Sequence, residues 1–199
     1  YIEAISAIDI ALWDICGKAL GVSAAHLMGG RQRECVEMYA TGCYYRGDQY
    51  LDLGKTLDEL KAEAAGYVDA GFKMLKVKIG LLSVEDDAKR VHAIRETVGD
   101  DVGIFVDCNH AYNAYTAVRM GKYLEKENVL FMEEPVIPED REGYRCVREK
   151  LDIAIAGGEA EYTLYGFRDF ITSRCIDIAQ PDITVCGGLT EFLRIRDFA

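Results

Sequence analysis

The 199-residue sequence lacks the features of a membrane protein or a nucleic-acid-binding protein. It has no apolar run near the roughly 20 residues needed to cross a bilayer, and its opening YIEAISAIDI is not a basic leader. Basic residues are in deficit, because 34 Asp and Glu outnumber 23 Lys and Arg and give a net charge of -11. Phosphate binding needs clustered cations. We therefore expect a cytoplasmic protein that binds neither membranes nor nucleic acid.

A zinc-site pattern is missing as well. The seven cysteines include no C-x-x-C pair and have no histidine at metal-site spacing. An odd number of scattered cysteines is typical of reduced thiols buried as small apolar side chains. We expect no structural zinc and no disulfide framework.

Apolar segments of strand length alternate with amphipathic segments of helical period. The predicted strands are 35–42, 72–80, 102–109, 129–135, 152–159 and 177–183. The predicted helices are 2–20, 56–71, 83–99, 114–128, 139–151, 163–175 and 189–199. Strict alternation predicts parallel strands joined by crossover helices, which is an α/β fold.

Two α/β architectures fit this alternation. A doubly wound sheet usually has a glycine-rich phosphate turn after its first strand, and ATGCYYRGD is not G-x-G-x-x-G. The last four predicted strands end at 109, 135, 159 and 183, a period of about 25 residues that is typical of a (β/α)8 barrel. Because a closed barrel needs about 250 residues, we predict an incomplete (β/α)8 barrel with about six of its eight units.

Two lysines occupy one face of the second predicted strand. In KMLKVKIG, Lys76 and Lys78 alternate with Leu75, Val77 and Ile79, so the lysines should point into a barrel and the apolar residues toward its helices. Their α-carbons should lie about 6.7 Å apart. At that separation two ammonium charges repel by about 2.5 kcal/mol at an effective dielectric of 20, or nearly two pKa units. One lysine can thus be neutral near pH 7.

Acidic residues end four successive predicted strands: Asp107, Glu133, Glu159 and Asp182, at intervals of 26, 26 and 23 residues. Three carboxylates held about 4 Å apart would repel by about 4 kcal/mol per pair at a dielectric of 20. They must share protons or bind a cation. Oxygen ligands favour a hard divalent ion, and we predict Asp107, Glu133 and Glu159 as ligands of Mg²⁺.

These features together predict proton chemistry next to a carboxylate. A neutral lysine near a Lewis acid can remove the proton α to a carboxylate, while nearby cations stabilise the enediolate. The ordered motifs K-x-K at 76–78, D-x-N at 107–109, EEP at 133–135, GGE at 157–159 and QPD at 180–182 resemble the mandelate racemase subgroup of the enolase superfamily, that is, the mandelate racemase/muconate lactonizing enzyme family. A lysine or histidine base used with Mg²⁺ is a known pattern of that superfamily.

The resemblance implies a role for each matching residue. Lys78 would be the base, and Lys76 would polarise the substrate carboxylate and depress the pKa of Lys78. Asp182 would orient a histidine on the next strand, which these 199 residues do not contain. Asn109 would help to position substrate or support the metal site. Thr41 and Tyr44, near the end of the first predicted strand, are further candidates for contact with substrate, with ordinary packing as the alternative. The metal ligands would be the three carboxylates predicted above.

The resemblance also implies a domain layout and an activity. Residues 1–30 would be a linker helix from the end of a mostly absent amino-terminal capping domain, and residues 31–199 the partial catalytic barrel. The expected activity is dehydration of an acid sugar, with a racemase or epimerase of a 2-hydroxy acid as an alternative. A catalytically incomplete, metal-binding barrel fragment is the alternative from another class. We also expect a homo-oligomer.

Ordinary structural roles compete with these assignments. Single lysines on a strand are usually solvated, and single carboxylates at strand ends often cap helices. Pro-Asp at 181–182 is also a common turn signal. Glu134 has the opposite parity to Glu133 and should form a structural salt bridge or cap, and His110 should be a surface loop residue.

Overall fold

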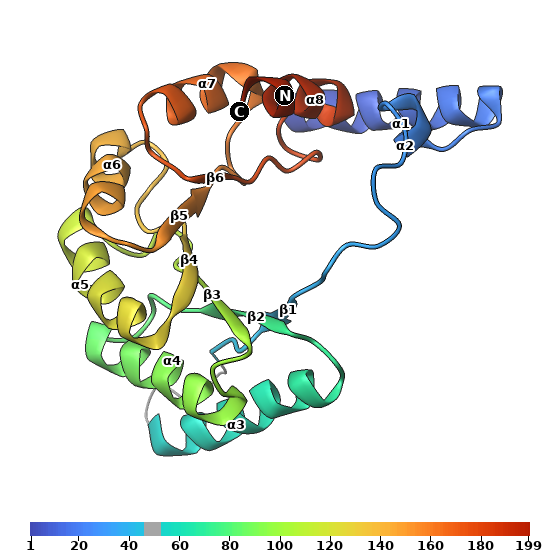
Figure 1. Ribbon diagram of the computed structural model, residues 1–199. Helices are drawn as coiled ribbons and strands as arrows, with labels where there is room; N and C mark the ends of the chain where they lie inside the picture. Colours follow the sequence, from blue (N-terminus) through green and yellow to red (C-terminus); the bar gives the residue numbers. More distant parts are fainter. Residues whose placement is uncertain (46–52) are drawn as a thin grey trace. The chain divides into compact units, whose positions relative to one another are not determined.

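A computed structural model, which describes residues 1–45 and 53–199, shows strands and helices alternating along the chain (Figure 1). The strands are β1 (Ala40–Gly42), β2 (Met74–Lys78), β3 (Gly103–Asp107), β4 (Val129–Glu133), β5 (Ala154–Gly157) and β6 (Ile178–Ala179). The α-helices are α1 (Ile2–Leu20), α2 (Ala24–Leu27), α3 (Leu53–Asp69), α4 (Val84–Val98), α5 (Ala114–Leu124), α6 (Arg141–Lys150), α7 (Thr163–Thr172) and α8 (Gly188–Phe198), and a 3-10 turn, η2 (Glu125–Glu127), extends α5. The predicted α/β class is confirmed.

The six strands form one sheet in the order β1-β2-β3-β4-β5-β6, which is also their order in the chain. The pairs from β1 to β5 are all parallel. Consecutive parallel neighbours need one crossover helix each, and α3 to α6 provide them. This is the arrangement of a (β/α) barrel rather than of a doubly wound sheet, whose strand order reverses.

The chain divides into two compact units. We call Met38–Ala156 with Cys175–Ile178 the strand unit, and Tyr1–Glu37 with Gly157–Arg174 and Ala179–Ala199 the terminal unit. Each unit has its own apolar cluster, and each is described by itself below.

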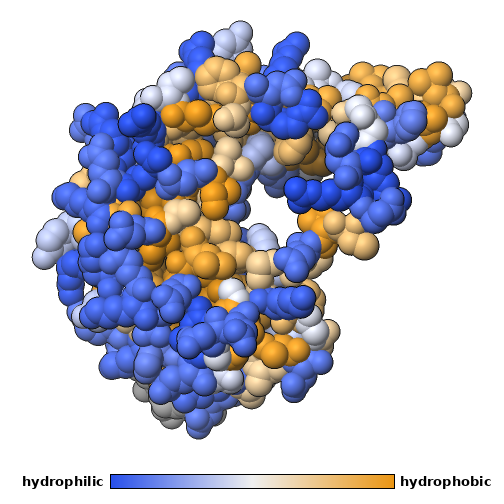
Figure 2. Space-filling model, in the orientation of Figure 1, coloured by the Kyte–Doolittle hydropathy of each residue, from blue (hydrophilic) through white to orange (hydrophobic). Residues whose placement is uncertain are grey.

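Helices cover one face of the sheet in the strand unit, where α4, α5 and α6 lie along β3, β4 and β5 (Figure 1). Residues pointing to that side are fully buried, including Leu75, Val77, Ile104 and Met132. Hydrophilic residues occupy the outer side of α5 and α6, whereas hydrophobic residues gather over the strands (Figure 2). This burial of one helix stripe against one sheet face is the main favourable term that stabilises a layered fold.

In the terminal unit, α8 packs against both α1 and α7. Its cluster is formed by Phe167, Cys186 and Ile195. Polar groups link the first and last helices, because the Thr190 amide donates to Oδ2 of Asp9 at 3.0 Å and the indole of Trp13 donates to Thr190 Oγ1 at 2.9 Å. Helix α1 ends at Gly21, whose φ of 67° is left-handed and suits a residue without a Cβ.

All six predicted strands are longer than the strands that form, and the first and the last differ most. Residues 35–39 lie outside β1, and the side chains of Val36 and Met38 are 71% and 68% exposed. Their apolar alternation has no partner strand, because only Ala40–Gly42 pairs with β2. The last strand stops at Ala179 rather than 183, where Gln180 still donates to Gly157 O at 3.0 Å but Pro181 has no N–H to continue the ladder.

The remaining helices and strands lie where the periodicity predicts them, with ends that differ by a few residues. The short helix α2 was not predicted, because four residues are too few to show a helical period. In the described residues, no helix combines the length and the apolar character needed to span a bilayer.

Candidate active site

The register of the strand unit places the predicted site residues of three strands side by side. Lys78 on β2 pairs with Asp107 on β3, and Asp107 pairs with Glu133 on β4. Asp107 and Glu133 are 0% and 1% exposed. Two buried carboxylates in adjacent strands would repel each other strongly unless positive charge lies near them.

Lys76 supplies part of that charge. Its Nζ lies 3.0 Å from Oε2 of Glu133 and 3.1 Å from Oδ2 of Asp107. Burial alone would lower the pKa of Lys76, but the hydrogen bond and charge of Glu133, together with Asp107, outweigh it and raise that pKa above its ordinary value. Lys76 is therefore an ammonium group that bridges the two carboxylates.

Lys78 reaches the same carboxylate from the strand end. Its Nζ donates to Oδ2 of Asp107 and, at 2.7 Å, to Oδ1 of Asn109. The two lysine nitrogens thus share one acceptor atom, Asp107 Oδ2. The Asn109 amide donates to Oδ1 of Asp107 at 3.0 Å, so both carboxylate oxygens are engaged.

A hollow of about 270 Å³ opens beside Lys78. It is lined by Tyr44, Tyr45, Lys78, Ile79, Gly80, Leu81, Cys108, Asn109 and Ala111. Tyr44 is 51% exposed, and Lys78 Nζ lies 5.8 Å from the centre of its ring, within cation-π range. Lys78, Tyr44 and Asn109 therefore face a space that a small molecule could enter.

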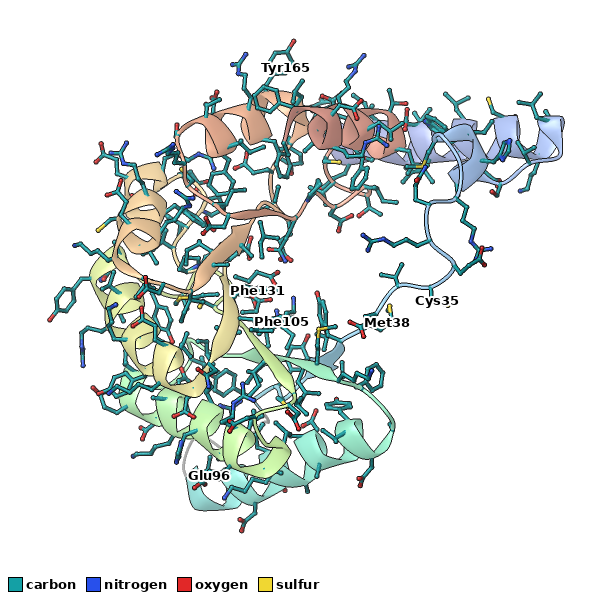
Figure 3. All side chains as sticks on the ribbon, viewed as in Figure 1. Cys35, Met38, Glu96, Phe105, Phe131 and Tyr165 are labelled. Carbon is teal, nitrogen blue, oxygen red and sulfur yellow. The ribbon has the colours of Figure 1, made fainter. Side chains whose placement is uncertain are left out.

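Stacked aromatic rings lie beneath the charged groups. Phe105 and Phe131 are two residues before Asp107 and Glu133, so they share the same sheet face, and their ring centres are 4.2 Å apart with planes 7° from parallel. Phe105 and Phe131 lie close together on β3 and β4 (Figure 3). Tyr39 packs edge-on against Phe105, with ring centres 5.3 Å apart. An apolar layer excludes water from below and strengthens the ionic contacts above it.

Glu134 and His110 form a second pair beside the first. Glu134 is 1% exposed, and its Oε2 lies 3.3 Å from Nε2 of His110, a contact that is a salt bridge when the imidazole is protonated. His110 is half-buried rather than the simple surface residue that we expected, because its ring packs onto this carboxylate. Both residues have positive φ angles, 63° at His110 and 45° at Glu134.

Three other predicted site residues, Thr41, Glu159 and Asp182, have exposed side chains. Thr41 is exposed and pairs in register with Lys76. Glu159 and Asp182 are exposed and belong to the terminal unit. Asp182 Oδ1 accepts hydrogen bonds from Thr184 N at 2.7 Å and from Thr184 Oγ1 at 2.6 Å, which is the local turn that a Pro-Asp sequence also predicts.

The donor set of the strand unit fits a hard cation. Within residues 1–45 and 53–199, no cluster of three or more His, Cys, Asp or Glu side chains stands in metal-binding geometry. Asp107 and Glu133 nevertheless present buried carboxylate oxygens close enough for one ammonium group to contact both. A pair that shares one cation in this way has the oxygen chemistry that Mg²⁺ prefers.

One buried charged cluster was not predicted. Asp87 and Arg90 on α4 are both 0% exposed and contact residues that line the hollow. A signal was present in the sequence, because both fall on the helix stripe that contains Val84, Val91 and Ile94, where apolar residues are expected.

Comparison with known families decides the assignment. Residues 59–199 match the family model described as enolase C-terminal domain-like, and residues 1–29 match the mandelate racemase/muconate lactonizing enzyme amino-terminal domain. The chain belongs to the mandelate racemase/muconate lactonizing enzyme family of the enolase superfamily. The predicted family and its barrel-type fold are thereby confirmed.

Relatives within this family include enzymes of acid-sugar metabolism. The chain is 41% identical over 198 residues to arabinonate dehydratase of Saccharolobus solfataricus, and the match covers 100% of the chain and 51% of that protein. Among solved structures, 3,6-anhydro-D-galactonate cycloisomerase from Zobellia galactanivorans is 43% identical with a TM-score of 0.91, covering 100% of the chain and 53% of its own.

A third relative was solved with ligands. A mutant of L-talarate/galactarate dehydratase, in complex with Mg and L-glucarate, is 33% identical with a TM-score of 0.89, and the match covers 100% of the chain and 48% of that protein. The chain spans about half the length of the curated relatives it matches.

Proposed function

We propose that the protein containing this chain removes the α-proton of an acid-sugar carboxylate and eliminates water from the β-carbon, as a Mg²⁺-dependent dehydratase. The observation that carries this proposal is the convergence of two lysine nitrogens on Oδ2 of Asp107, next to the buried carboxylate of Glu133. A base and a cation beside a carboxylate pair are the groups that this reaction needs.

Asp107 and Glu133, with Glu159 as the third ligand, would hold Mg²⁺. When bound, the ion supplies Lewis-acid stabilisation of the negative charge that develops on the substrate carboxylate. The buried oxygens of the first two residues support this assignment, and so does their shared contact with one ammonium group.

The two lysines have different surroundings, which supports different roles. Lys76 is 8% exposed and is held as an ammonium by Glu133 and Asp107, so it suits binding and polarising a substrate carboxylate. Lys78 borders the hollow of about 270 Å³, so its nitrogen can approach a substrate carbon.

Asn109 and Tyr44 complete the substrate side of the hollow. The side-chain oxygen Oδ1 of Asn109 accepts a hydrogen bond from Lys78 and can exchange that contact for a substrate hydroxyl. Tyr44 offers an exposed ring and hydroxyl at the rim. Thr41 and Asp182 stay candidates: Thr41 for substrate contact, from its place near the end of the first predicted strand, and Asp182 for orienting a histidine, from its motif position.

Dehydration balances with the groups described. The base takes the proton from Cα, the Cβ–O bond breaks, and the leaving hydroxyl takes a proton from the protonated base and departs as water, so that the base returns to its starting state. The resulting enol becomes a 2-keto acid by tautomerisation. The similarity to arabinonate dehydratase supports this outcome for a sugar acid.

Cycloisomerisation is the second candidate, because a structure at 43% identity is a cycloisomerase. Racemisation or epimerisation would use the same first step. These reactions differ from dehydration in their products, since only dehydration yields a 2-keto acid and water.

The decisive experiment is solvent exchange with the complete protein. Acid sugars are incubated with Mg²⁺ in D₂O, and deuterium at Cα is followed by NMR together with 2-keto acid formation. Lys78→Ala should lower exchange at one face by about 100-fold or more, because the base is gone. Lys150→Ala, which removes an exposed lysine at the end of α6, is the matched control and should exchange normally.

Retained exchange at that face in Lys78→Ala would reject Lys78 as the base. A wild-type protein that binds Mg²⁺ but exchanges no acid-sugar proton would instead favour a cation-binding scaffold.

A further inference from the structure

A buried ionic cluster joins helix α4 to the loops that border the hollow. Arg90 is 0% exposed, and its Nη2 donates to the carbonyl oxygen of Cys43 at 2.9 Å and to that of Lys78 at 3.5 Å. Cys43 follows β1 and Lys78 ends β2. One guanidinium group therefore ties together the main chains of two neighbouring strand ends.

Asp87, one helical turn earlier, holds the next segment. Its Oδ2 accepts from the Gly80 amide at 2.8 Å, and its Oδ1 accepts from the hydroxyl of Tyr45 and lies 3.6 Å from Arg90 Nε. The Tyr45 hydroxyl in turn accepts from the Leu81 amide at 3.2 Å. The turn after Lys78 is thus fixed by two amide hydrogen bonds that end on this cluster.

Stacking fixes the tyrosine loop against the same arginine. The guanidinium carbon of Arg90 lies 4.2 Å from the ring centre of Tyr45. Tyr44, the neighbouring residue, places its ring 5.8 Å from Lys78 Nζ. The positions of Tyr44 and Lys78 relative to each other consequently depend on Arg90 and Asp87.

Burying an ion pair has a high desolvation cost, and an apolar pair of similar size would serve packing as well or better. The cluster instead satisfies main-chain groups on two segments that border the hollow, residues 43–45 and 78–81. We propose that Asp87 and Arg90 are positioning residues, which hold Lys78 and the Tyr44–Tyr45 loop in register for proton transfer. The part of this inference that concerns turnover rests on the proposed function.

The chain offers a matched control on the same helix. Arg95 is also buried, at 8% exposure, and also donates to main-chain carbonyls, at Glu127, Gly99, Val102 and Asn128. Those carbonyls precede β3 and β4, at the amino-terminal ends of the strands, whereas Lys78 lies at the carboxyl end of β2. Arg95→Lys therefore disturbs an equivalent buried arginine without touching the strand ends at the hollow.

The test compares Arg90→Lys with Arg95→Lys in the complete protein. Lysine keeps the charge, but its ammonium group lacks the planar guanidinium that contacts two carbonyls and stacks on the Tyr45 ring. Both variants should lower the thermal midpoint. Arg90→Lys should also lower kcat for α-proton exchange by about tenfold with KM nearly unchanged, and Arg95→Lys should leave both parameters near wild type. Equal kcat losses in the two variants would overturn the inference.

A second measurement does not depend on turnover. Amide hydrogen exchange, followed by mass spectrometry, reports the Gly80 and Leu81 amides directly. In Arg90→Lys and in the milder Tyr45→Phe, these amides should exchange about fivefold faster than in Arg95→Lys. Unchanged protection would overturn the positioning role, even for a protein that shows no enzymatic exchange. Absent turnover in the wild type would reject only the proposed function, and amide exchange would then decide the inference.

Discussion

His110 and Glu134 meet across the ends of β3 and β4 through both their main chains and their side chains. The His110 amide donates to the Glu134 carbonyl at 2.9 Å, and the ring nitrogen Nε2 lies 3.3 Å from Oε2 of the carboxylate. Both residues adopt left-handed backbone angles, which cost residues with a Cβ about 1 kcal/mol or more. Such strain persists only where surrounding contacts hold it, and it is frequent at functional sites.

This strain predicts an unusual order of stabilities at position 110. His110→Ala and His110→Gly both remove the contact with Glu134, but only glycine relaxes at a φ of 63°. We expect His110→Gly to be more stable than His110→Ala by about 1 kcal/mol. Urea unfolding monitored by circular dichroism measures the difference. An alanine variant as stable as the glycine variant would show that the left-handed angle is not strained.

Gly80, two residues after the end of β2, should not tolerate a side chain. Its φ is 109°, and an added Cβ would lie 2.4 Å from Cβ of Ala111. We expect Gly80→Ala to destabilise the protein by about 2 kcal/mol, because the backbone and Ala111 must both shift. Gly66→Ala on α3 is the control, where the added methyl meets open space and should stabilise by about 0.5 to 1 kcal/mol. Thermal unfolding of both variants measures the contrast.

Glu133→Gln should weaken Mg²⁺ binding by about tenfold or more, because it replaces a buried carboxylate oxygen by a neutral amide. Isothermal titration calorimetry on the complete protein measures this affinity. Glu149→Gln, at an exposed position of α6, removes the same charge elsewhere and should bind Mg²⁺ like the wild type. Equal affinities in all three proteins would exclude Glu133 as a ligand.

The cysteines should separate into accessible and protected thiols. Burial, followed by the charge of Glu63, raises the pKa of Cys43 to about 12, so only about one thiol in a thousand is ionised at pH 9. Cys16 and Cys35 are exposed. Iodoacetamide at pH 9 should therefore label these two while Cys43 stays unmodified, as read by peptide mass spectrometry. Labelling of Cys43 before the chain unfolds in urea would contradict its burial.

Much of the fold could be predicted because β2, β3 and β4 alternate cleanly. The alternation of Lys76 and Lys78 with Leu75 and Val77 predicts which side faces the helices, and the two apolar residues are fully buried there. The prediction of a strand over residues 35–39 was wrong, because alternation shows which residues could form a strand and not whether a partner strand is available.

The site was predictable where it depends on strand register and unpredictable where it depends on side-chain contacts between elements. Asp107 and Glu133 are neighbours because each is the last residue of its strand and the two strands are parallel and paired. The Arg90 cluster could not be predicted in the same way, because its partners, Cys43 and Gly80, are brought to α4 only by loop conformation. A charged residue on an apolar stripe indicates a buried partner but does not identify it.

Among the described residues, each strand from β1 to β5 is hydrogen-bonded to its neighbours in chain order. No pairing in this part has to wait for a distant segment, so its loop-closure entropy is modest and its contacts are comparatively local. The sheet can consequently be assembled unit by unit while the polypeptide emerges from the ribosome, with each new βα unit docking onto an edge that already exists.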